Sequence, residues 1–205
     1  MKGLTCITAL LFFITAMITQ IAMAGVICGE PEDYEDENDN VWVTAEHEYT
    51  EDSWGGYREG TPKPESTFGQ NVAVVDNKTG YDDFLFRNCT WSLDNTPLLY
   101  DLNVDKGAYD VNLLIYDHWS AGVRELDIKI EDNIVFEDYT TVAEPVVQKV
   151  SGVEVKDGVL SIEIIPVKGC GDPCGMLSAL EVVGPAAVEL SGKLSTTWGK
   201  IKALH

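Results

Sequence analysis

The stretch RELDIKI, residues 124–130, decides the fold class, because apolar and charged side chains alternate along it. Leu126, Ile128 and Ile130 are separated by charged residues, and a period of two is typical of a β-strand with one buried and one wet face. The segment LSIEI, residues 160–164, repeats the pattern. Both segments therefore predict strands that cover a common core.

Further short segments rich in Val, Ile, Leu and aromatic residues follow one another from residue 71 onward. Turn residues separate many of them, and Lys106-Gly107, Asp132-Asn133 and Asp157-Gly158 fit hairpin turns. Before residue 185 the sequence has no convincing helix pattern. We therefore predict an all-β fold of two antiparallel sheets, either a β-sandwich or a jelly roll. The predicted strands are 71–76, 83–88, 97–104, 108–117, 123–131, 133–138, 159–167 and 176–184.

The two ends of the chain differ in composition from the strand-rich part. Residues 1–24 contain one lysine, a long apolar run and a small-x-small end, which is typical of a secretory signal peptide rather than a transmembrane helix. After Gly184-Pro185 the composition changes again, and residues 185–205 are predicted to be a tail. The predicted domain is therefore 25–184, exported to the extracellular space or the periplasm, with no membrane insertion once the signal peptide is removed.

The net charge limits the partners of the protein. The 34 acidic and 14 basic residues give a formal charge of −20, which would repel nucleic acids and anionic membrane surfaces. A neutral glycan or an extracellular protein remains compatible with this charge. The acidic segment 29–40 predicts a solvated loop, with a structural calcium ion as the alternative, although it lacks EF-hand spacing.

Cysteine usage agrees with export. Cys6 lies in the predicted signal peptide, and four cysteines remain, an even number that favours two disulfides in a secreted chain. Three pairings are open, and we expect Cys170–Cys174 and Cys28–Cys89. Zinc binding by the same thiols is the alternative, but only one short spacing is present.

One strand ends in an unusual set of side chains. The stretch NLLIYDHWSAG, residues 112–122, begins with apolar residues and then presents Tyr116, Asp117, His118 and Trp119 before a Ser-Ala-Gly turn. An active site, a metal site or a sugar-binding surface could each have this composition.

The order of several motifs resembles the malectin and malectin-like carbohydrate-binding domains. The segment ICGEP, 27–31, is similar to the first strand of that family, and VWVTAEHEYTEDSWGG, 41–56, follows its Trp…Tyr…Gly-Gly pattern with Glu46 in place of Asp. The stretch 107–139 and the closing segment LSALEVVG, 177–184, also match. The resemblance covers about residues 26–184 and implies a jelly-roll β-sandwich.

That resemblance implies a set of binding residues. In the family, glucose-containing oligosaccharides lie on aromatic side chains at strand ends, and acidic groups accept hydrogen bonds from hydroxyl groups. Matched motif by motif, the implied carbohydrate-binding residues are Trp119, Asp117, Trp91, Phe86, Asp172 and Tyr57. Ser120, where the family has a second aromatic residue, is a departure.

Two functions of different classes follow. The first is a non-catalytic module that binds a neutral glucose-containing oligosaccharide without a cofactor. The second is a structural or adhesion module that binds proteins on the cell surface. The first requires Trp119, Trp91 and Asp172 to converge on one exposed groove. An enzyme is not expected: a glycosidase needs two suitably spaced carboxylates, and nothing in the sequence marks a proton donor.

Overall fold

The computed structural model describes residues 23–184, apart from 68–69, 71 and 94, so most of the predicted signal peptide and the whole predicted tail lie outside the described residues. The protein is nearly all β, with 46% strand and 3% helix, as the sequence predicts. No helix in the described part of the chain is both long and apolar enough to cross a membrane.

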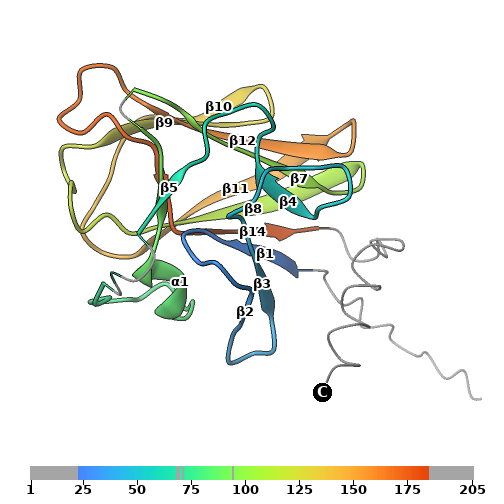
Figure 1. The fold of residues 1–205 in the computed structure, drawn as a ribbon, viewed down its shortest axis with the longest axis horizontal. Helices are drawn as coiled ribbons and strands as arrows, with labels where there is room; N and C mark the ends of the chain where they lie inside the picture. The colour runs from blue at the N-terminus through green and yellow to red at the C-terminus, as the bar shows by residue number, and fades with distance from the viewer. Residues whose placement is uncertain (1–22, 68–69, 71, 94, 185–205) are drawn as a thin grey trace, which may run out of the picture.

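Two sheets pack face to face in a sandwich (Figure 1). The six-stranded sheet has the order β11-β8-β14-β1-β3-β2, and the five-stranded sheet has the order β10-β9-β12-β7-β4. The strands of the first sheet are β11 (Val146–Val155), β8 (Gly107–Ile115), β14 (Ala179–Val183), β1 (Met23–Ile27), β3 (Val41–Thr44) and β2 (Tyr34–Glu35). Those of the second are β10 (Asn133–Thr140), β9 (Glu125–Ile130), β12 (Val159–Pro166), β7 (Leu98–Asn103) and β4 (Gly55–Tyr57).

The fold adds two features to the predicted pair of antiparallel sheets. A small third sheet, with the order β13-β6-β5, joins β13 (Met176–Leu177), β6 (Thr90–Trp91) and β5 (Glu65–Ser66). The pairing of β1 with β3 is parallel, whereas β1 runs antiparallel to β14. Met23 and Ala24 belong to β1, so cleavage at the predicted site would leave Gly25–Ile27 of this strand.

The core between the two large sheets follows the period of two that the sequence shows. On β9 the residues Leu126, Ile128 and Ile130 are buried, and the charged residues between them are only half-buried. The strands β12, β7 and β8 contribute equivalent rows to the same cluster. Each large side chain that is fully buried in this way contributes about 1.5–3 kcal/mol to stability.

A second apolar cluster lies on the outer face of the six-stranded sheet. Leu114 and Tyr116 point to this face, and Leu85 and Phe86 of α1 (Phe84–Arg87) cover it. The predicted strand 83–88 is therefore wrong, because this segment forms one helical turn whose Phe84 amide donates to Asp82. The predicted strand 71–76 is also not found: its described part, 72–76, has no regular secondary structure.

The connections differ from the predicted hairpins in two of three places. Residues 131–132 join β9 and β10 as an antiparallel hairpin. The turns at Lys106-Gly107 and Asp157-Gly158 instead carry the chain from one sheet to the other, since β7 and β12 lie in one sheet and β8 and β11 in the other. The ten-residue strand β11 is missing from the sequence-based prediction.

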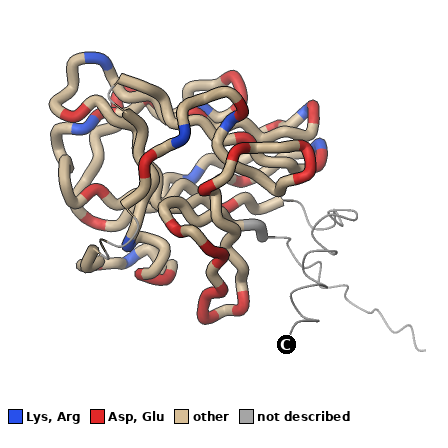
Figure 2. The backbone as a smooth tube through the Cα atoms, in the orientation of Figure 1, with Lys and Arg blue, Asp and Glu red and all other residues tan. Residues whose placement is uncertain are grey.

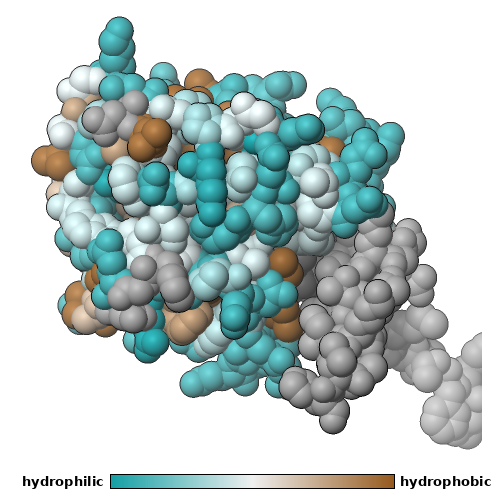
Figure 3. Space-filling view, in the orientation of Figure 1, coloured by the Kyte–Doolittle hydropathy of each residue, from teal (hydrophilic) through white to brown (hydrophobic). Residues whose placement is uncertain are grey.

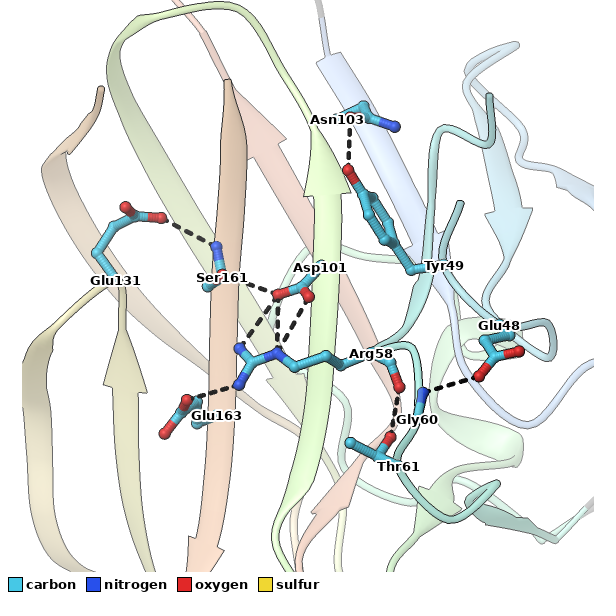
Figure 4. Close-up of polar contacts among 10 residues, drawn as sticks. All are labelled: Glu48, Tyr49, Arg58, Gly60, Thr61, Asp101, Asn103, Glu131, Ser161 and Glu163. Carbon is cyan, nitrogen blue, oxygen red and sulfur yellow. Dashed lines mark hydrogen bonds and ion pairs between the residues drawn. The ribbon is translucent and has the colours of Figure 1, made fainter. Parts of the chain in front are cut away.

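An ion-pair network crosses the outer face of the five-stranded sheet (Figure 4). Arg58, just after β4, bonds Asp101 of β7 and Glu163 of β12 at 3.0 and 2.8 Å, and Lys129 of β9 bonds Glu163 at 3.2 Å. The Ser161 hydroxyl also donates to Asp101. The short strand β4 is thus held to its sheet by side chains as well as by its ladder.

The surface in Figure 3 is largely hydrophilic with scattered hydrophobic residues. Acidic residues are distributed over many loops, as Figure 2 shows. This distribution agrees with the formal charge of −20.

Candidate functional site

Trp119, Trp91 and Asp172 line one hollow of about 300 Å³, which we call the tryptophan hollow. They come from three separate segments of the chain, and the loops after β8 and β12 meet at the same end of the sandwich in Figure 1. The other lining residues are Thr67, Gln70, Cys89, Arg124 and Cys174. The convergence that a carbohydrate-binding function requires is therefore present.

The two tryptophans are presented in different ways. Trp91 is half-buried on β6, where it pairs with Met176 of β13 and Glu65 of β5. Trp119 lies in the loop after β8 and is 47% exposed, an unusual exposure for so large an apolar side chain. One wall of the hollow is thus fixed by a sheet and the other by a loop.

Residues packed beneath Trp119 support its ring. The His118 and Trp119 ring centroids are 3.3 Å apart, and the His118 ring stacks on Tyr116 with centroids 5.5 Å apart. Burial lowers the pKa of His118 despite the opposing charge of Asp117, so the imidazole is neutral at pH 7. A neutral ring can pack against aromatic neighbours without the cost of burying a charge.

Asp117 shapes this loop and is not exposed to a ligand. Its side chain is fully buried, and it accepts hydrogen bonds from the backbone amides of Trp119 and Ser120 at 3.2 and 2.9 Å. The Thr141 hydroxyl donates to its other oxygen at 2.7 Å. The inferred sugar contact of Asp117 is therefore corrected: it holds the turn that presents Trp119.

Asp172 and Arg124 form the charged part of the tryptophan hollow. Arg124 Nη2 lies 2.7 Å from Asp172, Arg124 Nη1 lies 3.5 Å from Asp117, and the Ser120 hydroxyl donates to Asp172. Although burial raises the pKa of Asp172, hydrogen bonds from Ser120, Arg124 and Cys174 outweigh it and lower the pKa below its usual value. The Asp172 side chain remains 24% exposed, so an ionised carboxylate faces the hollow.

Two other residues implied by the resemblance lie elsewhere. Phe86 is 1% exposed in the cluster beneath α1, so it cannot contact a ligand on this surface. Tyr57 is half-buried on β4, packs against the main core and does not line the tryptophan hollow. Phe86 is thereby corrected to a core residue, and nothing places Tyr57 at the hollow.

The two expected disulfides are not formed. No disulfide joins Cys28, Cys89, Cys170 and Cys174 within the described part of the chain. Burial raises the pKa of the Cys28 and Cys89 thiols to about 12, so both are protonated in this structure. Cys170 donates to the Asp172 carbonyl at 3.2 Å, and Cys174 bonds the Asp172 carboxylate.

Sequence reasoning missed Arg124, Thr67 and Gln70 as residues that line the hollow. Arg124 is 5% exposed, and its Nε has no hydrogen-bond partner among the described residues. The detectable signal was an arginine at the start of an apolar strand, seven residues after a carboxylate. Thr67 and Gln70 carry no such signal, because they lie in a Gly/Pro/Ser-rich loop.

The acidic segment 29–40, predicted to be a solvated loop, is irregular apart from β2, which pairs with β3, and most of its residues are exposed or half-buried. Asp36 closes its turn by accepting hydrogen bonds from the backbone amides of Asn38 and Asn40 and from the Asn40 and Trp42 side chains. In the residues that the structure describes, no group of three or more His, Cys, Asp or Glu is arranged to hold a metal ion.

The tryptophan hollow has the chemistry of a small saccharide site. Aromatic faces pack against the C–H patches of a pyranose, and carboxylate, amide and guanidinium groups bond its hydroxyls. Trp91 and Trp119 supply the first kind of surface, and Asp172 and Gln70 supply the second. Loops on a rigid sandwich can hold such groups in place.

Comparison with solved structures gives the fold. The chain is similar to the extracellular domain of ANXUR2 from Arabidopsis thaliana, with a TM-score of 0.61, 13% identity, and coverage of 80% of this chain and 41% of that one. It is also similar to the plant receptor-like kinase FER, with a TM-score of 0.60, 12% identity, and coverage of 83% and 44%. A Bacteroides uniformis beta-glucuronidase gives a TM-score of 0.58, 15% identity, and coverage of 80% and 18%.

These similarities show a malectin-like β-sandwich fold at low sequence identity. The chain spans less than half the length of each of these proteins. No protein-family model and no curated protein sequence matches it.

Proposed function

We propose that this chain is an exported, non-catalytic module that binds a neutral glucose-containing oligosaccharide in the tryptophan hollow. The observation that carries the proposal is the convergence of Trp91, Trp119 and Asp172 from separate segments on one hollow. A fold found in an extracellular domain and in part of a glycosidase is compatible with this role.

The residues have distinct roles in the proposed complex. The exposed ring of Trp119 packs against one face of a pyranose, and Trp91 contacts the ring or its neighbour. Asp172 accepts hydrogen bonds from hydroxyl groups through an ionised carboxylate. Asp117 and Arg124 act indirectly: Asp117 shapes the loop, and Arg124 holds Asp172.

The charge of the site favours a neutral sugar. Two carboxylates, Asp117 and Asp172, contact Arg124, the one basic side chain among the described residues that line the hollow. The formal charge of the whole chain is −20. A uronate or a sulfated sugar would meet net repulsion at such a surface.

The test is calorimetry on the full chain with maltose-type and cellulose-type oligosaccharides. We expect a dissociation constant on the order of 10 μM to 1 mM, or roughly −7 to −4 kcal/mol. Trp119→Ala should lose about 1–3 kcal/mol of binding free energy, since it removes the exposed aromatic wall. Val123→Ala is the matched control: it lies in the same loop, is 51% exposed and does not line the hollow, so binding should be unchanged.

Three outcomes would contradict the proposal. Absence of binding to any glycan would favour the alternative module that binds proteins. Equal loss of binding in Trp119→Ala and Val123→Ala would show that the hollow is not the site. Release of new reducing ends during incubation would indicate hydrolysis and replace binding by catalysis.

Export is tested separately. We expect the secreted chain to begin at Gly25 after removal of residues 1–24, as N-terminal sequencing would show. A secreted chain that still begins at Met1 would contradict the predicted signal peptide.

A further inference from the structure

Thr141 is fully buried just after β10 and bonds to the loop that carries Trp119. Its amide donates to the Arg124 carbonyl at 3.0 Å, and its carbonyl accepts a hydrogen bond from the Gly122 amide at 2.8 Å. Its hydroxyl donates to Asp117 Oδ2 at 2.7 Å. One residue at the end of the five-stranded sheet thus contacts both the beginning and the end of the loop that follows β8 of the six-stranded sheet.

The hydroxyl of Thr141 has one proton to donate, and the distances assign that proton to Asp117. The Asp117 carboxylate lies 2.7 Å from the hydroxyl oxygen, whereas the Arg124 carbonyl lies 3.4 Å from it. Arg124 Nη1 is 3.5 Å from the same Asp117 oxygen, which is longer than an ordinary hydrogen bond. The Thr141 hydroxyl is therefore the better placed of the two donors to this carboxylate oxygen.

The other oxygen of Asp117 connects this contact to the tryptophan hollow. Asp117 Oδ1 accepts hydrogen bonds from the backbone amides of Trp119 at 3.2 Å and Ser120 at 2.9 Å. A carboxylate that is bonded at both oxygens cannot rotate, so the donor at Oδ2 fixes the acceptor that the turn uses at Oδ1. Thr141 is thus linked through one carboxylate to the residue that forms the exposed wall of the hollow.

A β-bulge in β10 decides that Thr141, and not Thr140, points inward. Between Phe136 and Tyr139 the register shifts, because β10 advances three residues while β9 advances two. Asp138 lies within this shift and has a φ of 50°. Side chains alternate between the faces of a strand, so one extra residue reverses the faces of all residues that follow. Accordingly, Thr140 is exposed and Thr141 is buried against the loop.

We propose that Thr141 is a positioning residue for ligand binding: its hydroxyl holds Asp117, and Asp117 holds the turn that presents Trp119 to the tryptophan hollow. Thr141 is not among the described residues that line the hollow, so it acts only through Asp117. The proposal rests on the proposed saccharide site, but the contact between Thr141 and Asp117 does not require a ligand.

The first measurement is amide hydrogen exchange of the full chain by NMR, without any ligand. Thr141→Val replaces the hydroxyl by a methyl group and leaves both backbone hydrogen bonds of the residue available. The amides of Trp119 and Ser120 should exchange about tenfold faster or more in this variant, because their acceptor is no longer held in place. The core amides of β12 should exchange at the wild-type rate.

Two further variants show whether the hydroxyl is the cause. Thr141→Ser restores a hydroxyl at the same position and should return both exchange rates close to those of the wild-type chain. Thr140→Val makes the same substitution at the exposed neighbouring residue and should leave both rates unchanged. If Thr141→Val accelerated exchange in β12 as much as in the turn, Thr141 would support the whole fold and the proposal would be overturned.

Calorimetry with the maltose-type and cellulose-type oligosaccharides measures the effect on binding. Thr141→Val should weaken binding about tenfold, because Trp119 is no longer held in advance in the geometry that the ligand needs. Thr141→Ser and Thr140→Val should bind as the wild-type chain does. Unchanged affinity in Thr141→Val, together with faster exchange at Trp119, would show that Thr141 orders the turn without affecting the ligand, and would overturn the proposal.

The two measurements separate this proposal from the proposed function. If the wild-type chain binds no glycan, the saccharide function fails, and the exchange rates alone decide whether Thr141 holds the turn. If the wild-type chain binds a glycan but the Trp119 and Ser120 amides exchange equally fast in wild type and Thr141→Val, the positioning role fails although the saccharide function stands.

Discussion

Two arginines of this protein each lie between two carboxylates, but with different consequences. Arg58, on the five-stranded sheet, has a side chain that is 28% exposed, and its Nε, Nη1 and Nη2 all donate to Asp101 or Glu163 (Figure 4). Arg124, beside the tryptophan hollow, has a side chain that is 7% exposed, and its Nε has no partner among the described residues. The Arg58 cluster is partly exposed, and all three guanidinium nitrogens have a hydrogen-bond partner. The Arg124 cluster is buried, and one guanidinium nitrogen has no partner among the described residues.

We infer from this difference that Arg58 stabilises the sheet, whereas Arg124 orients the Asp172 carboxylate. If Arg58 were removed, Asp101 would still accept a hydrogen bond from Ser161, and Glu163 would still pair with Lys129. Asp172 depends on Arg124 and on the loop that carries Ser120, and it remains open to the hollow. An ion-pair cluster that orients an exposed carboxylate beside two tryptophans is suited to binding.

Arg124→Met should have the largest effect on stability. The variant leaves Asp117 fully buried without its cation, and breaking a buried pair in this way costs about 3–5 kcal/mol. The free energy of unfolding from urea titration at pH 7 measures it. Lys168→Met, at an exposed residue of the nearby loop, is the charge-matched control and should change stability by less than about 0.5 kcal/mol. If Arg124→Met lowered the free energy of unfolding no more than Arg58→Met, the inferred difference between the two arginine clusters would be contradicted.

Asp172→Asn should have an intermediate effect. As a loop carboxylate it would be expected to contribute little to the fold, but the structure shows bonds to Arg124, Ser120 and Cys174. We expect a loss of about 1–2 kcal/mol in the free energy of unfolding, together with weaker saccharide binding. Urea titration and calorimetry on the same sample measure the two effects. Unchanged binding with reduced stability would assign Asp172 to the fold alone.

Strands that bury one face could be predicted from the sequence. The prediction was wrong where the local composition favours a strand but packing against the rest of the protein favours another conformation. The alternation in 124–130 and 160–164 corresponds to β9 and β12 because each strand has one face in the core. The segment 83–88 has the composition of a strand, yet it folds as α1 because Leu85 and Phe86 cover an apolar face of a sheet formed elsewhere in the chain. Nothing in the local pattern reveals that face.

For the candidate site, the sequence indicated the residue types but not which side chains are exposed. Trp119 precedes a Ser-Ala-Gly turn and is a binding residue implied by the resemblance, and its exposure of 47% is compatible with that role. Asp117 lies two residues earlier and points into the protein, where it bonds the backbone of its own turn. Arg124 joins the hollow only because two loops of the sandwich meet, and sequence spacing does not encode that meeting.

Arg58→Met should have a smaller effect than either variant at the tryptophan hollow. The Arg58 network is partly exposed, and Asp101 and Glu163 retain Ser161 and Lys129 as partners. Partly exposed ion pairs contribute little, so we expect a loss of about 1 kcal/mol. Urea titration at low and high sodium chloride measures it, and salt should reduce the difference between wild type and variant. A loss above that of Asp172→Asn would contradict the ranking.

The smallest expected effect is on acid stability. Hydrogen bonding from Arg58 is the main cause that holds the pKa of Glu163 below its usual value, and the pKa of Asp172 is also lowered, by Ser120 and Arg124 against the effect of burial. A carboxylate whose pKa is lowered in the folded state stabilises the fold fully above its unfolded pKa of about 4, and this contribution is lost as pH falls through the folded pKa. Stability should therefore decline as pH falls from about 5 towards 3.

Arg58→Met and Asp172→Asn should each flatten part of that decline, because each removes one source of the lowered pKa. Both groups are partly exposed, so each difference should be about 0.5 kcal/mol or less. Urea midpoints at pH 5, 4 and 3 measure it, with Lys168→Met as a control that changes net charge as Arg58→Met does. If stability declined with pH as steeply in Arg58→Met as in this control, the Arg58–Glu163 pair would not contribute to acid stability. If the decline were flattened only in Asp172→Asn, the acid-sensitive contact would lie beside the tryptophan hollow.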